Sequence, residues 1–563
     1  MGEKGMDEKG MDERNGGAGR EGGAVRSAKA AWLGFALVAG AFAWLWLDYR
    51  SFWLDDAFIT FRYAAHLAEG LGPVFNDPGV AGPGARVEGY TSFAWMLLSA
   101  AAFSLAPRLS DPGTALGLIK ALGFGLSLFT LYRVWTFPTP TPSPSRDPAP
   151  GRPVRRWLVV LLATQPVFVA NAGDGMETPL FSLLLLECAR SFGSRPSWPS
   201  GLATGLLAAA LVWTRPEALP LLVALPVLLL WARGTLRSGR AALRPWLTAF
   251  ASASVLPVLA HSLWRLSYYG ELLPNTYYAK ATGSLARRLD LGTADLTSFL
   301  GLEGGVPSLA LWLAVGLAAV AAAQGLRASA GPLARAWTAG LCLAVASRVA
   351  FDLWSGSEVM GVHRFLAPLL PPLFVLADEG ARKLAQRGGA RNAIALACVL
   401  ALVTNVAAHR RQSEMRGNYE RGLGNAHIAL GRWLAEHYSP DTWIALGDAG
   451  ALPFYSALPT IDLWGLNDAE IARLPGEYGA RPGLVSLVFE RAPDVLVLWN
   501  RVPLEDEAGK LRAAGGHPFD TALFQAPELT RHYRFVREFT FRRASPDVPG
   551  YYLNVFERKE EER

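Results

Sequence analysis

The stretch W-L-D-D-A-F-I-T-F-R-Y-A-A-H-L-A-E-G, residues 53–70, follows closely on the first apolar run of the chain, Ala31–Leu47. A second motif, R-V-E-G-Y-T-S-F-A-W, occupies residues 86–95. Charged side chains are costly beside the hydrocarbon of a membrane, so acids and cations next to an apolar span are functional candidates by default. The stretch therefore predicts a membrane protein with a polar site beside its first crossing.

The composition also indicates a membrane protein. Of the 563 residues, 51% are hydrophobic, and the mean hydropathy is +0.20. Apolar runs of about 15–22 residues recur over the first three-quarters of the chain, as expected for helices that cross ~30 Å of hydrocarbon. The 54 basic residues outnumber the 48 acidic ones and lie mostly in short loops, so they indicate membrane orientation and no nucleic-acid partner. The cysteines are expected to be buried apolar side chains: Cys188, Cys342 and Cys398.

The chain is predicted to cross the membrane eleven times, with a cytoplasmic N-terminus and a C-terminal region outside the cytoplasm. Basic residues gather in every second short connection, as the positive-inside rule requires. Ser92–Ala106 is predicted to be a short juxtamembrane or re-entrant helix, because another crossing there would move the basic loop at 146–156 to the outer face. The predicted crossings are Ala31–Leu47, Ala115–Trp135, Trp157–Ala170, Leu180–Cys188, Gly201–Trp213, Ala218–Trp231, Trp246–Tyr268, Pro307–Ala322, Trp337–Leu353, Phe365–Ala377 and Ala393–Ala408.

Three regions are predicted along the chain. Residues 1–28 have a charged, Gly-rich composition that cannot form a core, so they are expected to be a disordered cytoplasmic tail. Residues 29–408 are the predicted membrane domain, with an external loop at 49–92. Residues 409–563 are predicted to fold as a soluble α/β domain outside the cytoplasm, because the apolar runs stop there.

Within this last region, Ala426–Tyr438 has the pattern of an amphipathic helix. The motifs G-D-A-G (447–450) and L-P-T-I-D-L-W-G-L-N-D (458–468) have the composition of turns and loop. The predicted strands are Trp443–Leu446, Val495–Trp499, Phe535–Phe541 and Tyr551–Phe556.

The acidic pair Asp55 and Asp56 is the leading catalytic candidate. Group transfer to a hydroxyl needs a base that takes the acceptor proton, and a carboxylate can do this. Alternatively, one of the two caps a helix that starts near Ala57. Both roles fit at once, because one residue suffices as a cap. The two adjacent acids favour a function.

Two further loops carry charged side chains toward the same predicted face. In N-A-G-D-G-M-E-T-P (171–179), the Thr-Pro pair is ordinary helix punctuation, which requires neither Asp174 nor Glu177. In T-R-P-E (214–217), the first and last residues form a capping box. Arg215 is left over by that pattern, and an arginine at a membrane face can hold phosphate.

Two later loops mix aromatic and basic residues. In Y-Y-G-E-L-L-P-N-T-Y-Y-A-K (268–280), the first tyrosines are expected to be interfacial anchors, while Asn275, Tyr278 and Lys280 are candidates to contact phosphate or a polar substrate. His363 and Arg364 open a later crossing. They either stabilise a phosphate leaving group where water is excluded or extend toward the membrane interface.

These motifs in order resemble one branch of the GT-C glycosyltransferases, the terminal β-(1→2)-arabinofuranosyltransferases. GT-C enzymes are polytopic membrane proteins that take sugar from a polyprenyl-phosphate carrier. The resemblance spans about residues 53–468, which is more specific than any single motif. It rests on W-L-D-D-A-F-I-T-F-R-Y, R-V-E-G-Y-T-S-F-A-W, G-D-G-M-E-T-P-L-F, T-R-P-E, Y-Y-G-E-L-L-P-N-T-Y-Y-A-K, H-R-F-L-A-P and I-D-L-W-G-L-N-D.

The resemblance implies the GT-C fold, an acceptor-activating base at Asp55 or Asp56, and a polyprenyl-phosphate pentofuranose donor. It also implies that the C-terminal domain helps to hold a glycan acceptor. The chain departs from the family near Gly356–Met360, where G-S-E stands in place of an expected Gly-Gly-Asp, so that acid's role passes to Glu358. A divalent cation (Mg²⁺, Mn²⁺ or Ca²⁺) on Asp55, Asp174 or Glu177 is a further candidate.

The sequence thus predicts a glycosyltransferase of the bacterial cytoplasmic membrane, which moves an arabinofuranose-like sugar to a cell-envelope glycan or lipid on the outer face. The alternatives are a GT-C transferase for mannose or an aminosugar, a transporter or flippase of lipid-linked glycans, and a glycan-binding scaffold. The predicted substrate-binding residues are Arg62, Glu88, Tyr90, Asp174, Glu177, Arg215, Asn275, Tyr278, Lys280, Glu358, His363 and Arg364.

Overall fold

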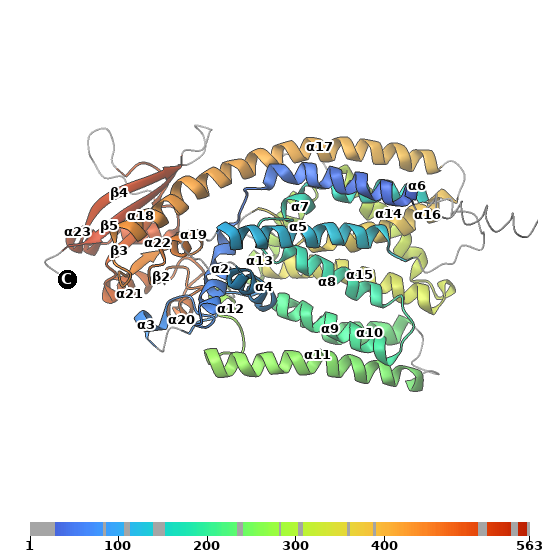
Figure 1. Cartoon of the computed structure of the whole chain (residues 1–563), viewed down its shortest axis with the longest axis horizontal. Helices are drawn as coiled ribbons and strands as arrows, with labels where there is room; N and C mark the ends of the chain where they lie inside the picture. The colour runs from blue at the N-terminus through green and yellow to red at the C-terminus, as the bar shows by residue number, and fades with distance from the viewer. Residues whose placement is uncertain are drawn as a thin grey trace, which may run out of the picture.

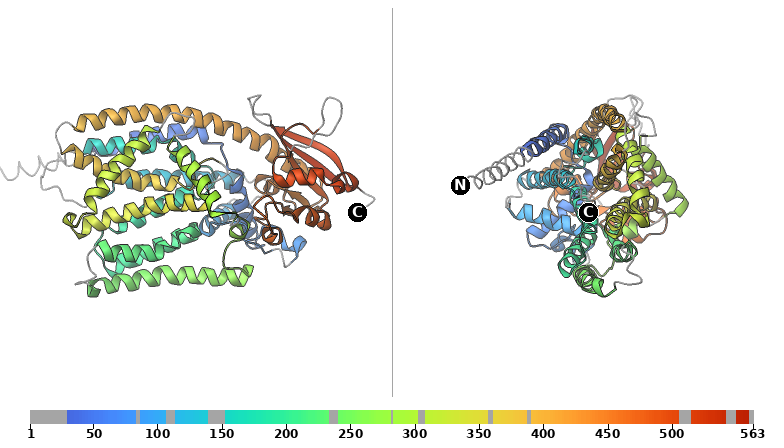
Figure 2. Two further views of the ribbon diagram at one scale, coloured as in Figure 1. Left: turned by 180° about the vertical axis from the view of Figure 1, so that it is seen from behind. Right: turned by 90° about the vertical axis from the view of Figure 1, so that its right-hand side faces the viewer.

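The structure, a computed structural model, consists of a long helical bundle with an α/β part at one end (Figure 1). The helices of the bundle run side by side along the long axis of the molecule (Figures 1 and 2). The described residues are 29–82, 86–105, 113–138, 152–232, 240–280, 283–301, 308–356, 361–386, 390–504, 515–541 and 550–559.

The bundle is that of a multi-pass membrane protein. Five segments are long and apolar enough to cross a membrane: Lys29–Tyr49, α5 (Gly113–Trp135), Leu243–Tyr269 within α11 (Arg240–Tyr269), α15 (Pro332–Ser355), and Ala390–His437, which begins with α17 (Ala390–Gly422). The remaining predicted crossings correspond to shorter helices beside them. These are α6 (Arg152–Ala163) with α7 (Pro166–Ala170), α8 (Thr178–Ser191), α9 (Trp198–Thr214), α10 (Leu221–Ala232), α14 (Leu309–Gly325) and α16 (Leu370–Ala385).

The loop after the first crossing, which was predicted to be external, folds into short helices at the end of the bundle that faces the sheet (Figure 1). α2 (Asp55–Ala68) packs against α4 (Phe93–Leu105), and α3 (Pro78–Ala81) lies between them in the chain. α4 is the predicted short helix. The later external loop contributes α12 (Asn275–Lys280) and α13 (Leu285–Phe299).

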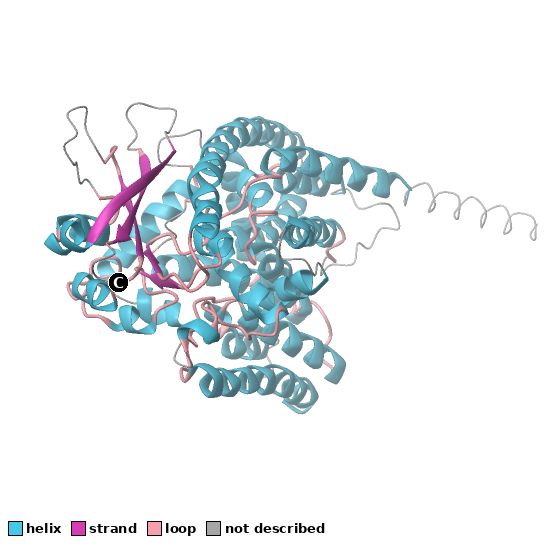
Figure 3. Ribbon diagram, turned by 60° about the vertical axis from the view of Figure 1, so that its left-hand side comes forward, coloured by secondary structure: helices cyan, strands magenta, loops and turns pink. Residues whose placement is uncertain are grey.

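The α/β part contains a five-stranded sheet with the strand order β2-β1-β3-β5-β4, seen in Figure 3. β1 (Ile444–Leu446) pairs in parallel with β2 (Thr460–Asp462) and β3 (Val495–Asn500), and β5 (Tyr551–Arg558) pairs antiparallel with β3 and β4 (Tyr533–Phe541). The four predicted strands are present. β2 lies in a stretch that was predicted as loop. The accompanying helices are α18 (Ala429–His437), α19 (Ala451–Ser456), α20 (Ala469–Arg473), α21 (Leu484–Arg491), α22 (Pro518–Gln525) and α23 (Pro527–His532).

One helix connects the two parts. α17 runs the length of the bundle and continues through a π-helical turn, Leu423–Ile428, into α18 beside the sheet (Figure 2). The predicted domain boundary at 408/409 falls inside this helix. There the His409 ring nitrogen Nε2 lies 2.9 Å from the Asp48 carboxylate at the end of the first crossing.

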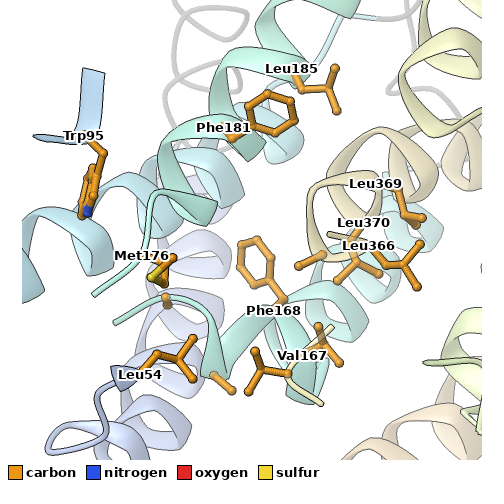
Figure 4. Close-up of a cluster of buried hydrophobic side chains, with 14 of the residues drawn as sticks. Leu54, Trp95, Val167, Phe168, Met176, Phe181, Leu185, Leu366, Leu369 and Leu370 are labelled. Atoms are coloured by element: carbon orange, nitrogen blue, oxygen red, sulfur yellow. The ribbon is translucent and has the colours of Figure 1, made fainter. Parts of the chain in front are cut away.

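A buried apolar cluster lies beneath the external loops. Side chains from α2's N-cap, from α4, from α7 and α8, and from the 3₁₀ turn Ala367–Leu369 meet there (Figure 4). Dense packing of this kind resists displacement, so it holds the loops above it in fixed positions. The labelled members are Leu54, Trp95, Val167, Phe168, Met176, Phe181, Leu185, Leu366, Leu369 and Leu370.

Candidate active site

The two acids of the D-D motif are the first residues of α2. The residue before them, Leu54, is the N-cap; it makes no side-chain cap, and its backbone N–H donates to the Asp174 carbonyl at 3.0 Å. The alternative in which Asp55 or Asp56 is the capping residue is therefore wrong. Both carboxylates lie in the first helical turn, where the helix dipole favours negative charge.

Asp56 pairs with Arg364. The Arg364 Nη2 donates to the Asp56 Oδ2 at 2.9 Å, although the two residues are 308 positions apart in the chain. The Asp56 side chain keeps 25% of its surface exposed, whereas the Arg364 side chain keeps only 8%. Burial opposes ionisation of this carboxyl, but the positive charges of Arg364 and Lys280 outweigh it and lower the pKa of Asp56. Asp56 is thus an accessible carboxylate held beside two cations.

Lys280 reaches the same place from the other external loop. It is the last residue of α12, is exposed, and has its ammonium 5.9 Å from the centre of the Tyr478 ring. α12 is tied to the α/β part at its first residue, because the Asn275 amide donates to the carbonyls of Gly465 at 2.8 Å and Leu466 at 3.0 Å. Asn275 therefore positions Lys280.

A second charged group lies next to Arg364. Arg215 pairs with Glu177 at 2.5 Å and with Glu217, and Glu217 also pairs with Arg348 at 3.3 Å. The guanidinium groups of Arg215 and Arg364 both lie against the Phe365 ring, 4.7 Å and 5.5 Å from its centre. Arg215 is thus next to Arg364, but its charge is balanced by the carboxylates of Glu177 and Glu217.

Asp55 faces the α/β part. Its Oδ1 accepts from the Ala451 backbone N–H at 2.8 Å, and its own N–H donates to the Tyr419 hydroxyl at 3.1 Å. Gly450 allows this approach, since a Cβ there would lie 2.2 Å from the Asp55 carbonyl oxygen and 2.3 Å from its carboxylate. Burial, opposed by His427, raises the pKa of Asp55 to about 6.

The groups near Asp55 on the α/β part were not predicted from the sequence. The Asp448 carboxylate lies 3.2 Å from the His427 Nε2 and accepts from the Tyr551 hydroxyl at 2.5 Å. Burial opposes protonation of the imidazole, but Asp448 outweighs it and raises the pKa of His427 to about 9. The signal was present in G-D-A-G, which was interpreted only as a turn.

Three predicted substrate contacts are engaged in structural interactions. The Arg62 guanidinium donates to the carbonyls of Phe75, Pro453 and Leu458 at 2.6, 2.5 and 2.8 Å, which ties the external loop to the α/β part. Glu88 is buried and pairs with Arg265 at 2.6 Å. The Tyr90 hydroxyl lies 3.2 Å from that of Tyr269.

The remaining predicted residues that the structure describes make other contacts. Asp174 is fully buried and accepts from the Met176 N–H at 2.9 Å. His363 has a φ of 53°, and its Nδ1 lies 2.9 Å from Asp295, which orients the neighbouring Arg364. Tyr278 lies under the Arg473 guanidinium at 4.7 Å. Glu358 lies outside the described residues.

The carboxylates proposed as metal ligands do not converge. Asp55 bonds to Ala451, Glu177 pairs with Arg215, and Asp174 accepts from Met176. Within the described ranges, no group of three or more His, Cys, Asp or Glu side chains is arranged to hold a metal ion. The residues in view do not fit a cation at these positions, and no chemical step is derived through one.

Superposition on solved structures identifies the fold. The archaeal oligosaccharyltransferase AglB from Archaeoglobus fulgidus, in complex with an inhibitory peptide and a dolichol-phosphate, superposes with a TM-score of 0.58 at 11% identity, over 94% of this chain and 88% of that one. ArnT from Cupriavidus metallidurans, bound to undecaprenyl phosphate, superposes with a TM-score of 0.51 at 13% identity, over 93% and 98%. The protein has the GT-C fold.

One curated protein is also similar to this chain in sequence. The chain is 32% identical over 271 residues to the terminal beta-(1->2)-arabinofuranosyltransferase of Mycobacterium tuberculosis (strain ATCC 25618 / H37Rv), which confirms the predicted resemblance. The match covers 44% of this chain and 38% of that relative, so the chain aligns with well under half of the relative's length. A family model described as a domain of unknown function (DUF8728) matches residues 408–555.

Proposed function

We propose that the protein is a glycosyltransferase that takes a sugar from a polyprenyl-phosphate donor, with Asp56 as the general base. The observation that carries this is the accessible Asp56 carboxylate paired with Arg364 and close to the charge of Lys280. A base for the acceptor and cations for the leaving phosphate are the two elements that such a transfer needs.

The reaction uses these groups in one step. The acceptor hydroxyl gives its proton to Asp56 as its oxygen forms a bond to the anomeric carbon of the donor sugar. The bond between that carbon and the phosphate oxygen breaks, and its electron pair leaves with the polyprenyl phosphate. Arg364 and Lys280 neutralise the charge that develops on the phosphate, where exclusion of water strengthens the interaction.

Arg364 links donor binding to the basicity of Asp56. In the structure, Arg364 pairs with Asp56 and helps to lower its pKa. A donor phosphate competes for the same guanidinium, because arginine binds phosphate in the same bidentate manner as carboxylate. Asp56 then becomes a stronger base only when a donor is bound, which limits proton transfer without a donor.

The donor sugar is proposed to be a pentofuranose of the arabinofuranose type, moved to a cell-envelope glycan or lipid on the outer face of a bacterial cytoplasmic membrane. The sequence similarity to an arabinofuranosyltransferase supports this choice. The dolichol-phosphate and undecaprenyl phosphate bound by the two structural neighbours support a lipid-phosphate donor. Placement of the site at the outer face follows from the predicted topology.

The test is transfer by purified protein in lipid vesicles with a panel of donors: polyprenyl-phosphate arabinofuranose, mannose and aminoarabinose. Transfer from the arabinofuranose donor alone is expected. Transfer only from another donor would overturn the sugar assignment. Movement of lipid-linked glycan across the vesicle without transfer would instead support a transporter. Asp77→Asn is a matched control for Asp56→Asn, because Asp77 lies in the same loop and its side chain caps α3.

A further inference from the structure

Two aromatic rings of the α/β part stand at the edge of the candidate site. Trp464 follows β2, and Tyr478 lies in the loop between α20 and α21. Their rings are stacked, with centroids 4.5 Å apart and planes at 29°, and both side chains are half-buried. Stacking covers the facing side of each ring, and the two half-buried side chains keep part of their outer surface exposed.

The pair is held rigidly. His517 and Phe519 pack edge-on against the Trp464 indole, at 4.7 and 5.0 Å. The backbone N–H of Trp464 donates to the Asp462 carboxylate at 3.0 Å. Gly479 makes the close stacking possible, since its φ is +78° and a Cβ there would lie 2.5 Å from the indole.

The pair adjoins the charged centre. The Lys280 ammonium lies 5.9 Å from the Tyr478 ring centre. Burial is the largest cause that raises the pKa of Tyr478, and the carboxylates of Asp462 and Asp56 add to it, so the phenol lies within electrostatic reach of the proposed base. The Arg481 guanidinium donates to the Ala279 carbonyl at 2.8 Å, which joins the Tyr478 loop to α12.

We propose that the Trp464–Tyr478 pair is a binding platform for a sugar ring of the acceptor. The inference rests on the proposed transferase function. One face of a sugar ring carries C–H groups, which pack favourably on the electron-rich face of an aromatic ring. The exposed Lys280 ammonium beside the pair is suited to the hydroxyls at the edge of that ring.

The position of the pair favours the acceptor over the donor. A lipid-linked donor is anchored in the bilayer, and Arg364, which shortly precedes the 3₁₀ turn Ala367–Leu369 before α16, belongs to the helical bundle. Trp464 and Tyr478 belong to the α/β part, which lies at the end of the bundle where α2 is found (Figure 1). A glycan that arrives from outside the membrane would meet this platform first and present its hydroxyl to Asp56.

The experiment measures initial rates with polyprenyl-phosphate arabinofuranose as donor and an octyl arabinofuranoside as acceptor. Trp464→Ala is expected to raise the acceptor KM about threefold to tenfold and to leave the donor KM unchanged, the range that corresponds to one aromatic contact. Trp464→Phe keeps an aromatic face and is expected to restore most of the affinity. Release of free sugar from the donor by water, measured without acceptor, should equal that of the wild type.

The control is Trp433→Ala. Trp433 makes a similar stack with His437 on α18, at 4.4 Å and 27°, and it packs against Phe539 of β4. Its acceptor KM should match that of the wild type. The proposal is overturned if Trp464→Ala leaves the acceptor KM unchanged or raises the donor KM instead. If the wild type transfers no sugar from any donor in the panel, the proposed function itself fails, which is a distinct outcome.

Discussion

Asp55 and Asp56 are neighbours in the chain, yet they serve opposite sides of the molecule. Asp56 pairs with Arg364 of the bundle, the charges of Arg364 and Lys280 lower its pKa, and part of its surface stays exposed. Asp55 faces the α/β part, where burial raises its pKa to about 6 and the Ala451 N–H occupies its Oδ1. The comparison assigns chemistry to Asp56 and attachment of the α/β part to Asp55.

Helix geometry explains the difference. Successive residues of an α-helix point about 100° apart, so two adjacent acids at a helix start cannot share one environment. In the first turn of α2, Asp56 therefore contacts Arg364 of the bundle, and Asp55 contacts Ala451 of the α/β part. The same sequence pattern gives one charge that is available to substrate and one that is enclosed.

The sharpest test of this comparison is Asp56→Asn. It removes the proposed base and keeps the size of the side chain, so we expect the rate of transfer to fall by roughly 10²–10⁴. Initial rates in lipid vesicles measure it, with thermal unfolding to show that the fold is intact. A rate within twofold of the wild type would mean that another group takes the acceptor proton.

Arg364→Gln should have the next largest effect. Loss of a preorganised cation at a leaving group costs about 10²–10³ in rate, and binding of polyprenyl phosphate should weaken in parallel. Both can be measured on one preparation. Arg534→Gln is the control, because Arg534 is exposed on β4 and pairs with Glu557 of the neighbouring strand β5. Equal rates for the two variants would remove Arg364 from the proposed mechanism.

Asp55→Asn should act mainly on stability. Burial raises the pKa of Asp55 to about 6, so its charge near pH 7 opposes folding. The neutral amide keeps the acceptor for the Ala451 N–H, and we expect the free energy of unfolding at pH 7 to rise by about 1–3 kcal/mol. Transfer should fall by about tenfold or less. A loss of transfer as large as that of Asp56→Asn, with unchanged stability, would reverse the assignment of the two acids.

The smallest predicted effect is a pH dependence of stability. The folded-state pKa of His427, about 9, lies above its usual 6.5, so its charge stabilises the fold fully below pH 6.5 and that contribution is lost as the pH rises through 9. We expect the free energy of unfolding to fall by roughly 1–3 kcal/mol across this window, and thermal unfolding at a series of pH values measures it. His427→Gln should flatten the curve, and an unchanged slope in that variant would contradict the role of His427.

Much of the fold was predictable, because long apolar runs have few alternatives to crossing helices. β2 was missed because three residues in a Gly- and Asn-containing stretch carry no strand period. Arg364 and Asp56 were both predicted as site residues, but their pairing across 308 positions was not. His427 and Asp448 were missed because one reads as part of an amphipathic helix and the other as a turn residue.

Arg62 and Asn275 were also predicted as substrate contacts, and the fold gives both a different use. Each donates to backbone carbonyls of the α/β part. The sequence marks a polar residue near a membrane as unusual, but it cannot separate a contact to substrate from a contact between domains. Only the partner atoms decide this, and for these residues the partners lie hundreds of positions away.

The most direct test of the account is a structure of the protein with a bound polyprenyl phosphate. We predict that the phosphate lies within hydrogen-bond distance of Arg364 and Lys280, and that Asp56 has lost its pair with Arg364 and faces the α/β part. A phosphate that contacts neither cation, or one bound at the other end of the bundle, would contradict the assignment of Asp56 as the base.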